Sequence, residues 1–354
     1  MTANKYNNSK IVWFNEKLIS LRDDYVTSPI YVRIKPINKC THKCFFCVYN
    51  NDYSNMHENM SNSDVLDKNK LFEILDDFKE MNVKAITLSG GGEPLLYPNI
   101  VDALKKTKDN GIDLSIITNG QLLKGEKLKE LIDAKWVRIS MDYHNEKEFS
   151  KSRFVPEKLF FEIVENIKNF AAQKSKNCDL SANYIITKLN CETIIQSMNF
   201  LKELGIDNVR ISPLWNNDFI NYHKDIKEKV IADINYSRKI LQDDNFKIYD
   251  SYNITKDQLI RTYNRCYVMQ IIPVIGADGN VYTCHNKAYD NEGLIGNIND
   301  KSFKEMWFSE DTHKFFNNFN PSKLCSHQCA NDSKNIFLID IINNIENRQF
   351  KKHI

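Results

Sequence analysis

Short apolar runs alternate with longer segments of helical spacing up to about residue 213, and this alternation constrains the fold more than any other feature. The short runs predict six β-strands, at residues 30–34, 85–88, 114–117, 136–141, 182–186 and 209–213. Helical spacing predicts the intervening helices, at residues 71–81, 100–110, 126–134, 156–171 and 193–204. Repeated strand–helix units pair as parallel strands joined by right-handed crossovers, so we expect an α/β fold.

Six units are too few for a closed barrel, which uses eight. We therefore predict a partial (β/α)6 barrel over residues 30–220, preceded by an N-terminal extension at residues 1–29. Loops at the carboxyl ends of the strands form the reaction site in such folds. A polar stretch at 221–262 predicts a helical connector, and 263–340 predicts a small domain of β-hairpin and helices before a tail at 341–354.

Charge and hydropathy exclude several classes of function. The chain of 354 residues has 48 Lys and Arg against 46 Asp and Glu. Its net charge of +2 creates no field that would attract nucleic acid or an anionic membrane. No apolar run reaches the ~18 residues that a membrane span needs, and the polar residues 1–10 do not resemble a signal peptide. We therefore expect a cytoplasmic protein that binds neither nucleic acid nor membrane.

Nine cysteines, most of them in two clusters, indicate metal binding, because disulfides are rare in a reducing compartment. The first cluster is Cys40, Cys44 and Cys47, in the loop after the first predicted strand. Three thiolates can bind three irons of a 4Fe–4S cluster and leave the fourth iron open to another ligand. A zinc site completed by His42 or His57 is the alternative.

A glycine-rich loop, Ser89 to Pro94, follows the second predicted strand. Together with the spacing of the first cysteine cluster and the aromatic Phe46, it resembles the signature of the radical S-adenosylmethionine (SAM) superfamily. Glycines let a backbone approach a ligand closely. The resemblance implies a SAM site made of Gly91, Gly92, Glu93, Pro94, Asn119, Ser140 and Asp142. A turn or helix-capping role is the alternative for the last three.

The resemblance extends over about residues 30–214 and implies a radical reaction. In that superfamily the cluster passes one electron to SAM, which releases methionine and a 5′-deoxyadenosyl radical, and the radical removes a hydrogen atom from the substrate. The cofactors supply this chemistry, while the protein positions the substrate and excludes water. A reductant such as flavodoxin or ferredoxin is the implied electron donor.

The second cluster lies in the predicted C-terminal domain and consists of Cys266, Cys284, Cys325 and Cys329. Asp278-Gly279 predicts a β-hairpin between the first two of these cysteines. Their order resembles the SPASM/Twitch extension of radical SAM enzymes, and four cysteines fit the shorter Twitch form with one fully ligated 4Fe–4S cluster. A closed zinc site is the alternative. We expect His285 and His327, beside the ligands, to be structural.

A fully ligated second cluster can accept an electron from a substrate radical. We therefore expect a net oxidation, the dehydrogenation of a sugar- or cyclitol-like molecule, which also needs a base. The base candidates are His144, Asp218, Tyr143 and Arg153. Cys191, after the fifth predicted strand, is a candidate hydrogen-atom donor, and a buried apolar role is its alternative.

Other functions stay open at this stage. A redox-neutral epimerase would use Cys191 to quench the substrate radical. Modification of a ribosomal peptide is a further alternative, although 29 residues before the first strand are too few for the leader-binding module that many such enzymes carry. A non-enzymatic protein with two zinc sites is the remaining alternative. The sequence does not identify the substrate, because loops at the barrel mouth make its contacts and their side chains follow no general motif.

Overall fold

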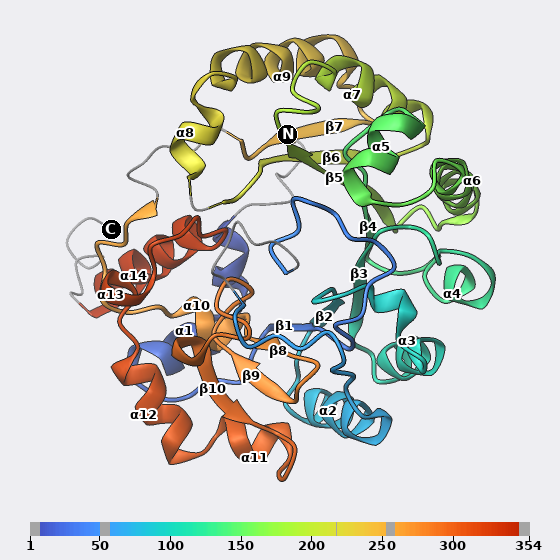
Figure 1. Cartoon of the computed structure of the whole chain (residues 1–354). Coiled ribbons are helices and arrows are strands. Elements are labelled where there is room, and N and C mark those ends of the chain that lie inside the picture. The colour runs from blue at the N-terminus through green and yellow to red at the C-terminus, as the bar shows by residue number, and fades with distance from the viewer. Residues whose placement is uncertain (1–7, 50–56, 217, 253–258, 347–354) are drawn as a thin grey trace.

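The structure, a computed structural model, describes residues 8–49, 57–216, 218–252 and 259–346 (Figure 1). Its strands form one sheet in the order β10-β9-β8-β1-β2-β3-β4-β5-β6-β7. Neighbouring strands from β1 to β7 are all parallel. These strands are Tyr31–Ile34 (β1), Ala85–Leu88 (β2), Asp113–Thr118 (β3), Trp136–Ser140 (β4), Asp179–Ile186 (β5), Asn208–Pro213 (β6) and Lys247–Asp250 (β7).

Helices join the parallel strands and lie along the outside of the strand arc in Figure 1. They are Lys68–Glu80 (α2), Ile100–Asp109 (α3), Gly125–Lys129 (α4), Glu146–Arg153 (α5), Lys158–Gln173 (α6), Ile194–Glu203 (α7), Phe219–Lys224 (α8) and Lys227–Leu241 (α9), with the 3-10 helix Pro94–Leu96 (η2). Within the part of the chain that the structure describes, the sheet has two ends, β10 and β7. The fold is therefore the partial α/β barrel that the sequence predicts.

Alternation of side chains explains why these segments become strands covered by helices. In β1, Val32 and Ile34 are fully buried against the outer helices, while Tyr31 and Arg33 on the other face are half-buried. Helix α2 buries an apolar stripe of matching helical period, made of Leu71, Ile74, Leu75 and Phe78. The carboxylate of Asp67 caps this helix by accepting from the backbone N–H groups of Asn69 at 2.8 Å and Lys70 at 3.0 Å.

Two predicted segments differ from the structure. The stretch from 221 to 262, predicted as a helical connector, also contains β7, which pairs with β6. In this end strand only Ile248 is buried, so the apolar signal is weak. Helix α4 ends at Lys129 rather than at the predicted residue 134. The chain continues there as tighter turns, in which the N–H of Leu131 donates to the carbonyl of Leu128 at 3.0 Å.

The C-terminal part continues the same sheet. Strand β8 (Val274–Ile275) pairs parallel with β1, and β9 (Asn280–Tyr282) and β10 (Leu294–Asn297) follow as antiparallel neighbours. The predicted hairpin is confirmed, and Gly279 supplies its positive φ of 76°. The remaining elements are Val268–Ile271 (α10), Asn291–Gly293 (η4), Phe303–Trp307 (α11), Glu310–Asn318 (α12), Pro321–Leu324 (α13) and Asp332–Glu346 (α14).

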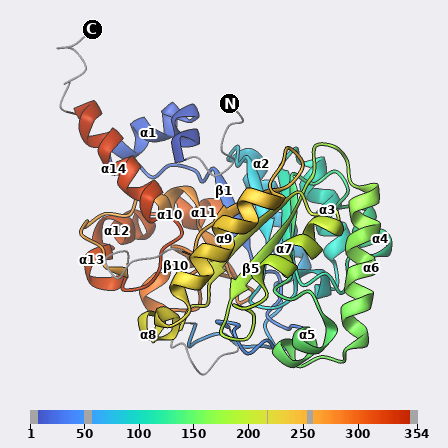
Figure 2. The ribbon, with the colours of Figure 1, turned by 90° about the horizontal axis from the view of Figure 1, so that it is seen from above.

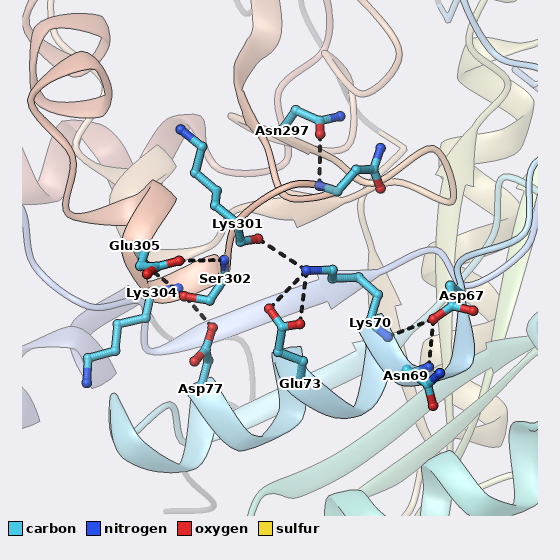
Figure 3. A network of polar contacts seen from close by, with 11 residues as sticks. Asp67, Asn69, Lys70, Glu73, Asp77, Asn297, Lys301, Ser302, Lys304 and Glu305 are labelled. Carbon is cyan, nitrogen blue, oxygen red and sulfur yellow. Dashed lines mark hydrogen bonds and ion pairs between the residues drawn. The ribbon is translucent and has the colours of Figure 1, made fainter.

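A polar network fastens the C-terminal part to α2 (Figure 3). The Lys70 ammonium donates to Glu73 in the same helix at 2.9 Å and to the backbone carbonyl of Lys301 at 3.2 Å. Further along α2, Asp77 accepts from the backbone N–H of Lys304 at 2.9 Å. These bonds join the helix after β1 to the start of α11, so the two halves of the chain meet along α2.

Aromatic packing holds the same junction. The Phe303 ring lies edge-on to Phe78 with 5.1 Å between centroids and is stacked on Trp307 at 5.3 Å. All three rings are fully buried. The indole N–H of Trp307 donates to the carbonyl of Thr27 at 2.9 Å, which ties the N-terminal segment to the same place. Packing of this kind fixes the orientation of the C-terminal part on the barrel.

The predicted N-terminal extension forms the 3-10 helix Asn8–Trp13 (η1) and the helix Asn15–Arg22 (α1). Both lie beside α14, as Figure 2 shows for α1. Their apolar contact includes Leu18 and Leu21 from α1 with Leu338 and Ile342 from α14. Among the described residues, no helix has the length and apolar character that crossing a membrane requires.

Candidate functional site

The first three cysteines lie in the loop that leaves the carboxyl end of β1. Each is half-buried, and all nine cysteines of the chain are free thiols. The loop is anchored to the end of α5, because the N–H of Lys43 donates to the carbonyl of Arg153 at 3.0 Å and the N–H of Phe45 donates to that of Ser152 at 3.1 Å. This anchoring holds the cysteines over the mouth of the barrel.

Arg153 stabilises the loop through its side chain as well. Its guanidinium is buried, forms an ion pair with Asp142, and donates to the carbonyl of Ser140 at 3.0 Å. It also lies 3.7 Å from the sulfur of Cys44. Burial opposes its charge, but Cys44 and Asp142 outweigh burial and raise the pKa of Arg153. The ion pair with Asp142 stabilises the charged guanidinium, so this geometry gives no support to Arg153 as a base, and that role stays a prediction.

The glycine loop after β2 packs directly on the cysteine loop. A Cβ atom added to Gly92 would lie 2.0 Å from the backbone oxygen of Lys39, and one added to Gly91 would lie 2.0 Å from Oδ1 of Asn38. The N–H of Gly92 donates to the carbonyl of Ile37 at 3.1 Å. In this structure the glycines therefore let two backbone segments meet. Their predicted contact with SAM stays a prediction.

Glu93 links this loop to the end of β3. Its buried carboxylate accepts from the hydroxyl of Thr118 at 2.7 Å and from the backbone N–H groups of Asn119 at 2.8 Å and Leu95 at 3.0 Å. Burial raises its pKa. Pro94 occupies the first position of η2, where no N–H is needed. These residues form a rigid junction, and binding of the SAM amino group by Glu93 stays a prediction.

The predicted polar residues of the mouth are brought together. The Asn119 amide donates to the hydroxyl of Thr41 in the cysteine loop at 3.0 Å. Asp142 accepts from the backbone N–H of Ile185 at 2.8 Å in addition to its ion pair with Arg153. The ends of β3, β4 and β5 are thus connected around the cysteine loop. The residues predicted for the SAM site surround one mouth, as a bound SAM molecule would require.

Burial raises the pKa of six of the seven predicted ligand thiols, so these six are protonated at neutral pH unless a metal binds them. Burial raises the pKa of Cys40 to about 11 and that of Cys44 to about 12. Burial also raises the pKa of Cys266 well above its usual range, and repulsion from Cys329 and Cys284 adds to this effect. These second-cluster thiols are close enough to interact, and binding of iron would relieve the repulsion between their thiolates.

Within the described ranges, no three His, Cys, Asp or Glu side chains are grouped closely enough to hold one metal ion. A 4Fe–4S cluster requires a wider arrangement of thiolates, because each one binds a different iron. The donor set of three sulfurs at the barrel mouth and four sulfurs in the C-terminal part fits such clusters. As for the other predicted ligands, burial raises the pKa of Cys325 to about 12 and that of Cys329 to about 11.

Lys35 lies between the two cysteine regions. It is buried, donates to the carbonyl of Gly90 at 3.0 Å and forms a hydrogen bond with the hydroxyl of Tyr49. Its ammonium lies over the rings of Tyr49 at 4.1 Å and Tyr289 at 5.5 Å. Tyr289 in turn donates to Asn38 at 2.5 Å. These contacts connect the glycine loop and the cysteine loop to the C-terminal part.

A cavity of about 280 Å³ opens inside the barrel between the two cysteine regions. Its wall on the barrel side includes Arg33, Ile117, Arg138, Asn183 and Arg210. The rest of its lining includes His57 and four residues next to predicted ligands, Val48, His285, His327 and Gln328. Val48 directly follows Cys47, His285 directly follows Cys284, and His327 lies between Cys325 and Cys329. A molecule in this cavity would therefore contact residues adjacent in sequence to predicted ligands of both clusters.

The predicted catalytic residues lie outside the lining of this cavity. Cys191 is buried and its sulfur lies 3.6 Å from the carbonyl of Lys188. His144 is hydrogen-bonded to Ser197 at 3.3 Å, and Asp218 is exposed at the start of α8. The catalytic roles of Cys191, His144 and Asp218 stay predictions, and the lining of the cavity does not support them. The lining arginines were not predicted, and their signal in the sequence is a Val-Arg-Ile tripeptide repeated in β1, β4 and β6.

Two sequence models of known families match the chain. One describes the radical SAM superfamily and matches residues 34–201, and the other describes an iron–sulfur cluster-binding domain, SPASM, and matches residues 266–330. The chain belongs to the radical SAM superfamily. The cofactors of this radical SAM enzyme are SAM and two 4Fe–4S clusters, one for each matched region. The residues that bind these cofactors stay predictions, and the positions described above are compatible with them.

Relatives with curated names are distant. A probable GTP 3′,8-cyclase of Sulfolobus acidocaldarius is 26% identical over 195 residues, which cover 55% of this chain and 59% of that protein. A tungsten-containing aldehyde ferredoxin oxidoreductase cofactor-modifying protein of Pyrococcus furiosus is 24% identical over 306 residues, or 79% of this chain and 81% of that protein. This radical SAM enzyme thus spans little more than half the length of the cyclase.

Among solved structures, SuiB of Streptococcus suis bound to S-adenosylmethionine superposes with a TM-score of 0.63. The two chains share 17% sequence identity, and the superposition covers 86% of this chain and 72% of SuiB. At this identity the likeness shows the fold alone. It supports the partial-barrel fold described above.

Proposed function

We propose that this radical SAM enzyme removes a hydrogen atom from a small molecule in the central cavity and completes a net two-electron oxidation. One observation carries the proposal: the same cavity is lined by residues next to both sets of predicted ligands, including Val48 on one side and His285 on the other. A substrate there would lie within reach of the SAM site and of an electron acceptor. The sugar- or cyclitol-like nature of the substrate stays a prediction.

The cofactors, when bound, would supply a 5′-deoxyadenosyl radical and an oxidised 4Fe–4S cluster as electron acceptor. The oxidation would balance if the substrate lost one hydrogen atom to that radical, which becomes 5′-deoxyadenosine, and then one electron and one proton. The four C-terminal cysteines would hold the electron acceptor, and a base would take the proton. The barrel walls hold the substrate and exclude water during these steps. A flavodoxin or ferredoxin would reduce the SAM-binding cluster, and the cytoplasm would provide both.

His57 is positioned to accept the proton. It lines the cavity, and its Nδ1 lies 2.6 Å from the carbonyl of Ala288, which can only accept. Nδ1 therefore carries the hydrogen, and Nε2 presents a lone pair in the neutral ring. Burial, with a smaller contribution from Lys35, lowers the pKa of His57 to about 4, so the ring is neutral at physiological pH and would hold the proton only weakly before passing it to solvent.

Peptide modification is the second candidate, because SuiB has also been solved bound to its precursor peptide SuiA. Epimerisation has less support, since Cys191, the proposed hydrogen donor, lies outside the cavity lining. The alternative of two zinc sites has no support, because the C-terminal part matches an iron–sulfur cluster-binding domain.

The first experiment tests radical generation. Protein purified and reconstituted without oxygen should contain about eight irons per chain and should form 5′-deoxyadenosine from SAM with dithionite. The variant C40A/C44A/C47A should lose about half of that iron and all SAM cleavage. Cys178→Ala is the matched control, because Cys178 is a buried thiol outside both clusters. Stoichiometric zinc without iron, or SAM cleavage by the triple variant, would overturn the proposal.

The second experiment separates oxidation from redox-neutral reactions. The enzyme is incubated with SAM, reductant and a fractionated extract of small metabolites, and fractions that increase 5′-deoxyadenosine are examined by mass spectrometry. An oxidation predicts a product lighter than its precursor by one pair of hydrogen atoms. A product of unchanged mass would exclude oxidation and support epimerisation or rearrangement.

A further inference from the structure

Three strands of the barrel carry the same tripeptide, Val-Arg-Ile, and place its arginine on the inner face. The arginines are Arg33 in β1, Arg138 in β4 and Arg210 in β6. In each case the flanking valine and isoleucine are buried against the outer helices, while the arginine is half-buried. Because side chains alternate along a strand, all three guanidiniums lie on the cavity side of the sheet.

The neighbouring inner positions are polar too. Strand register places Arg138 beside Ser181, Arg210 beside Asn183, and Arg33 beside Thr87. The inside of a closed barrel is normally filled by Val, Ile and Leu. Here the same layer carries hydroxyl, amide and guanidinium groups around an open space of about 280 Å³. The layer is therefore built to bind a polar molecule rather than to pack as a core.

Serine hydroxyls orient two of the guanidiniums. Nε of Arg138 donates to the hydroxyl of Ser181 at 3.3 Å, and Nε of Arg210 donates to that of Ser251 at 3.2 Å. Arg138 is further supported by the Trp136 ring, 4.9 Å from its guanidinium carbon. A hydroxyl that accepts from Nε fixes the direction of the arginine side chain. A guanidinium held in a fixed orientation can bind a carboxylate or a phosphate group through two parallel hydrogen bonds.

The charge of the lining is one-sided. Arg33, Arg138 and Arg210 all line the cavity, and an arginine keeps its charge in a protein. Among the lining residues that the structure describes, none is Asp or Glu. Walls of one sign around a small cavity concentrate the field inside it. A ligand with negative charge is the natural counterpart of such a field.

We propose that the cavity binds its substrate through an oxyanion, a carboxylate or a phosphate group, held by Arg33, Arg138 and Arg210. This inference rests on the proposed function for the claim that the cavity is the substrate site. A cavity of about 280 Å³ is at the lower end for ligand pockets, so the anion belongs to a small molecule.

Isothermal titration of the full, anaerobically reconstituted chain with saturating SAM tests this inference. The probes are pyrophosphate and citrate, which separate a phosphate from a carboxylate ligand. We expect one of them to bind the wild type and to lose at least about tenfold in affinity in R138Q/R210Q, because two charge-assisted bonds are removed. The variant R138K/R210K keeps the positive charge but lacks the planar guanidinium with its paired N–H donors, so it should bind the probe with intermediate affinity.

The matched control is K105Q/K135Q, which loses the same charge on the outside of the barrel, where both lysines are exposed. Thermal melting confirms that each variant is folded, and R210Q alone replaces the double variant if that fails to fold. Equal weakening in the control, absence of binding by either probe, or complete displacement of the probe by SAM would overturn the inference. If the same wild-type preparation still cleaves SAM, the proposed function survives such a result, whereas loss of cleavage would refute the function itself.

Discussion

The contact between the glycine loop and the cysteine loop can be tested by adding one carbon atom. A Cβ at Gly92 would lie 2.0 Å from the backbone oxygen of Lys39 and 2.5 Å from the backbone carbon of Asn38. Ordinary contacts of this kind need about 3.5 Å. Backbone cannot rotate away as a side chain can, so Gly92→Ala should force one loop to move by about 1 Å or more.

The loss of stability depends on how rigid the site is, and the loss of function depends on which residues the displaced backbone carries. Overpacking of a rigid site costs about 1–3 kcal/mol. Lys39 directly precedes Cys40, so the movement is transmitted to the first predicted ligand. Gly111→Ala is the control, because Gly111 has a φ of 72° but nothing within 4 Å of an added Cβ. That control should cost a similar ~1–2 kcal/mol by backbone strain alone.

Iron content, 5′-deoxyadenosine formation and thermal melting should be measured on both variants in parallel. We expect G111A to melt about 2–4 °C lower and to keep its iron and its rate of SAM cleavage. We expect G92A to lose iron from the first cluster and to cleave SAM at least about tenfold more slowly. If G92A kept wild-type iron and rate, the glycine loop would not position the cysteine loop, and the reasoning would be refuted.

Two further predictions concern stability, measured by urea unfolding. Arg153→Met leaves Asp142 buried without its ion-pair partner, which should lower the free energy of unfolding by about 3–5 kcal/mol. The double variant D142N/R153M removes the unpaired charge and should recover part of this loss. Equal stability of R153M and D142N/R153M would contradict the ion-pair argument. Phe303→Ala empties the space between Phe78 and Trp307 and should cost about 3–5 kcal/mol, whereas the exposed Phe308, changed to Ala, should stay within about 0.5 kcal/mol.

The barrel was predictable because its strands bury one face under helices. Residues such as Ile86 and Leu88, fully or almost fully buried, give a strong apolar signal, and all six predicted strands are present. Strand β7 was missed because it lies at the end of the sheet and buries only Ile248. Position in a sheet, which decides how much of a strand is buried, is not visible in local sequence.

The site was predictable only where spacing along the chain reflects chemistry. The cysteine and glycine motifs are local, so they could be recognised and placed at strand ends. Cys191 and His144 also follow strands, but the direction of a side chain depends on the turn that carries it, and both lie outside the cavity lining. Arg138 and Arg210 were overlooked because an arginine in a strand is normally interpreted as solvent-facing.

The same alternation that builds the barrel also builds its candidate site. Each Val-Arg-Ile strand buries two apolar side chains outward and leaves one guanidinium inward, so outer packing stabilises a fold whose interior need not be filled. Pairing of β8 with β1 then makes the C-terminal part continuous with the barrel sheet. The separation of the two cysteine regions is consequently set by strand hydrogen bonds and by packing on α2, rather than by a flexible linker. A substrate between them would meet a fixed distance to each cluster, which radical abstraction and electron transfer both require.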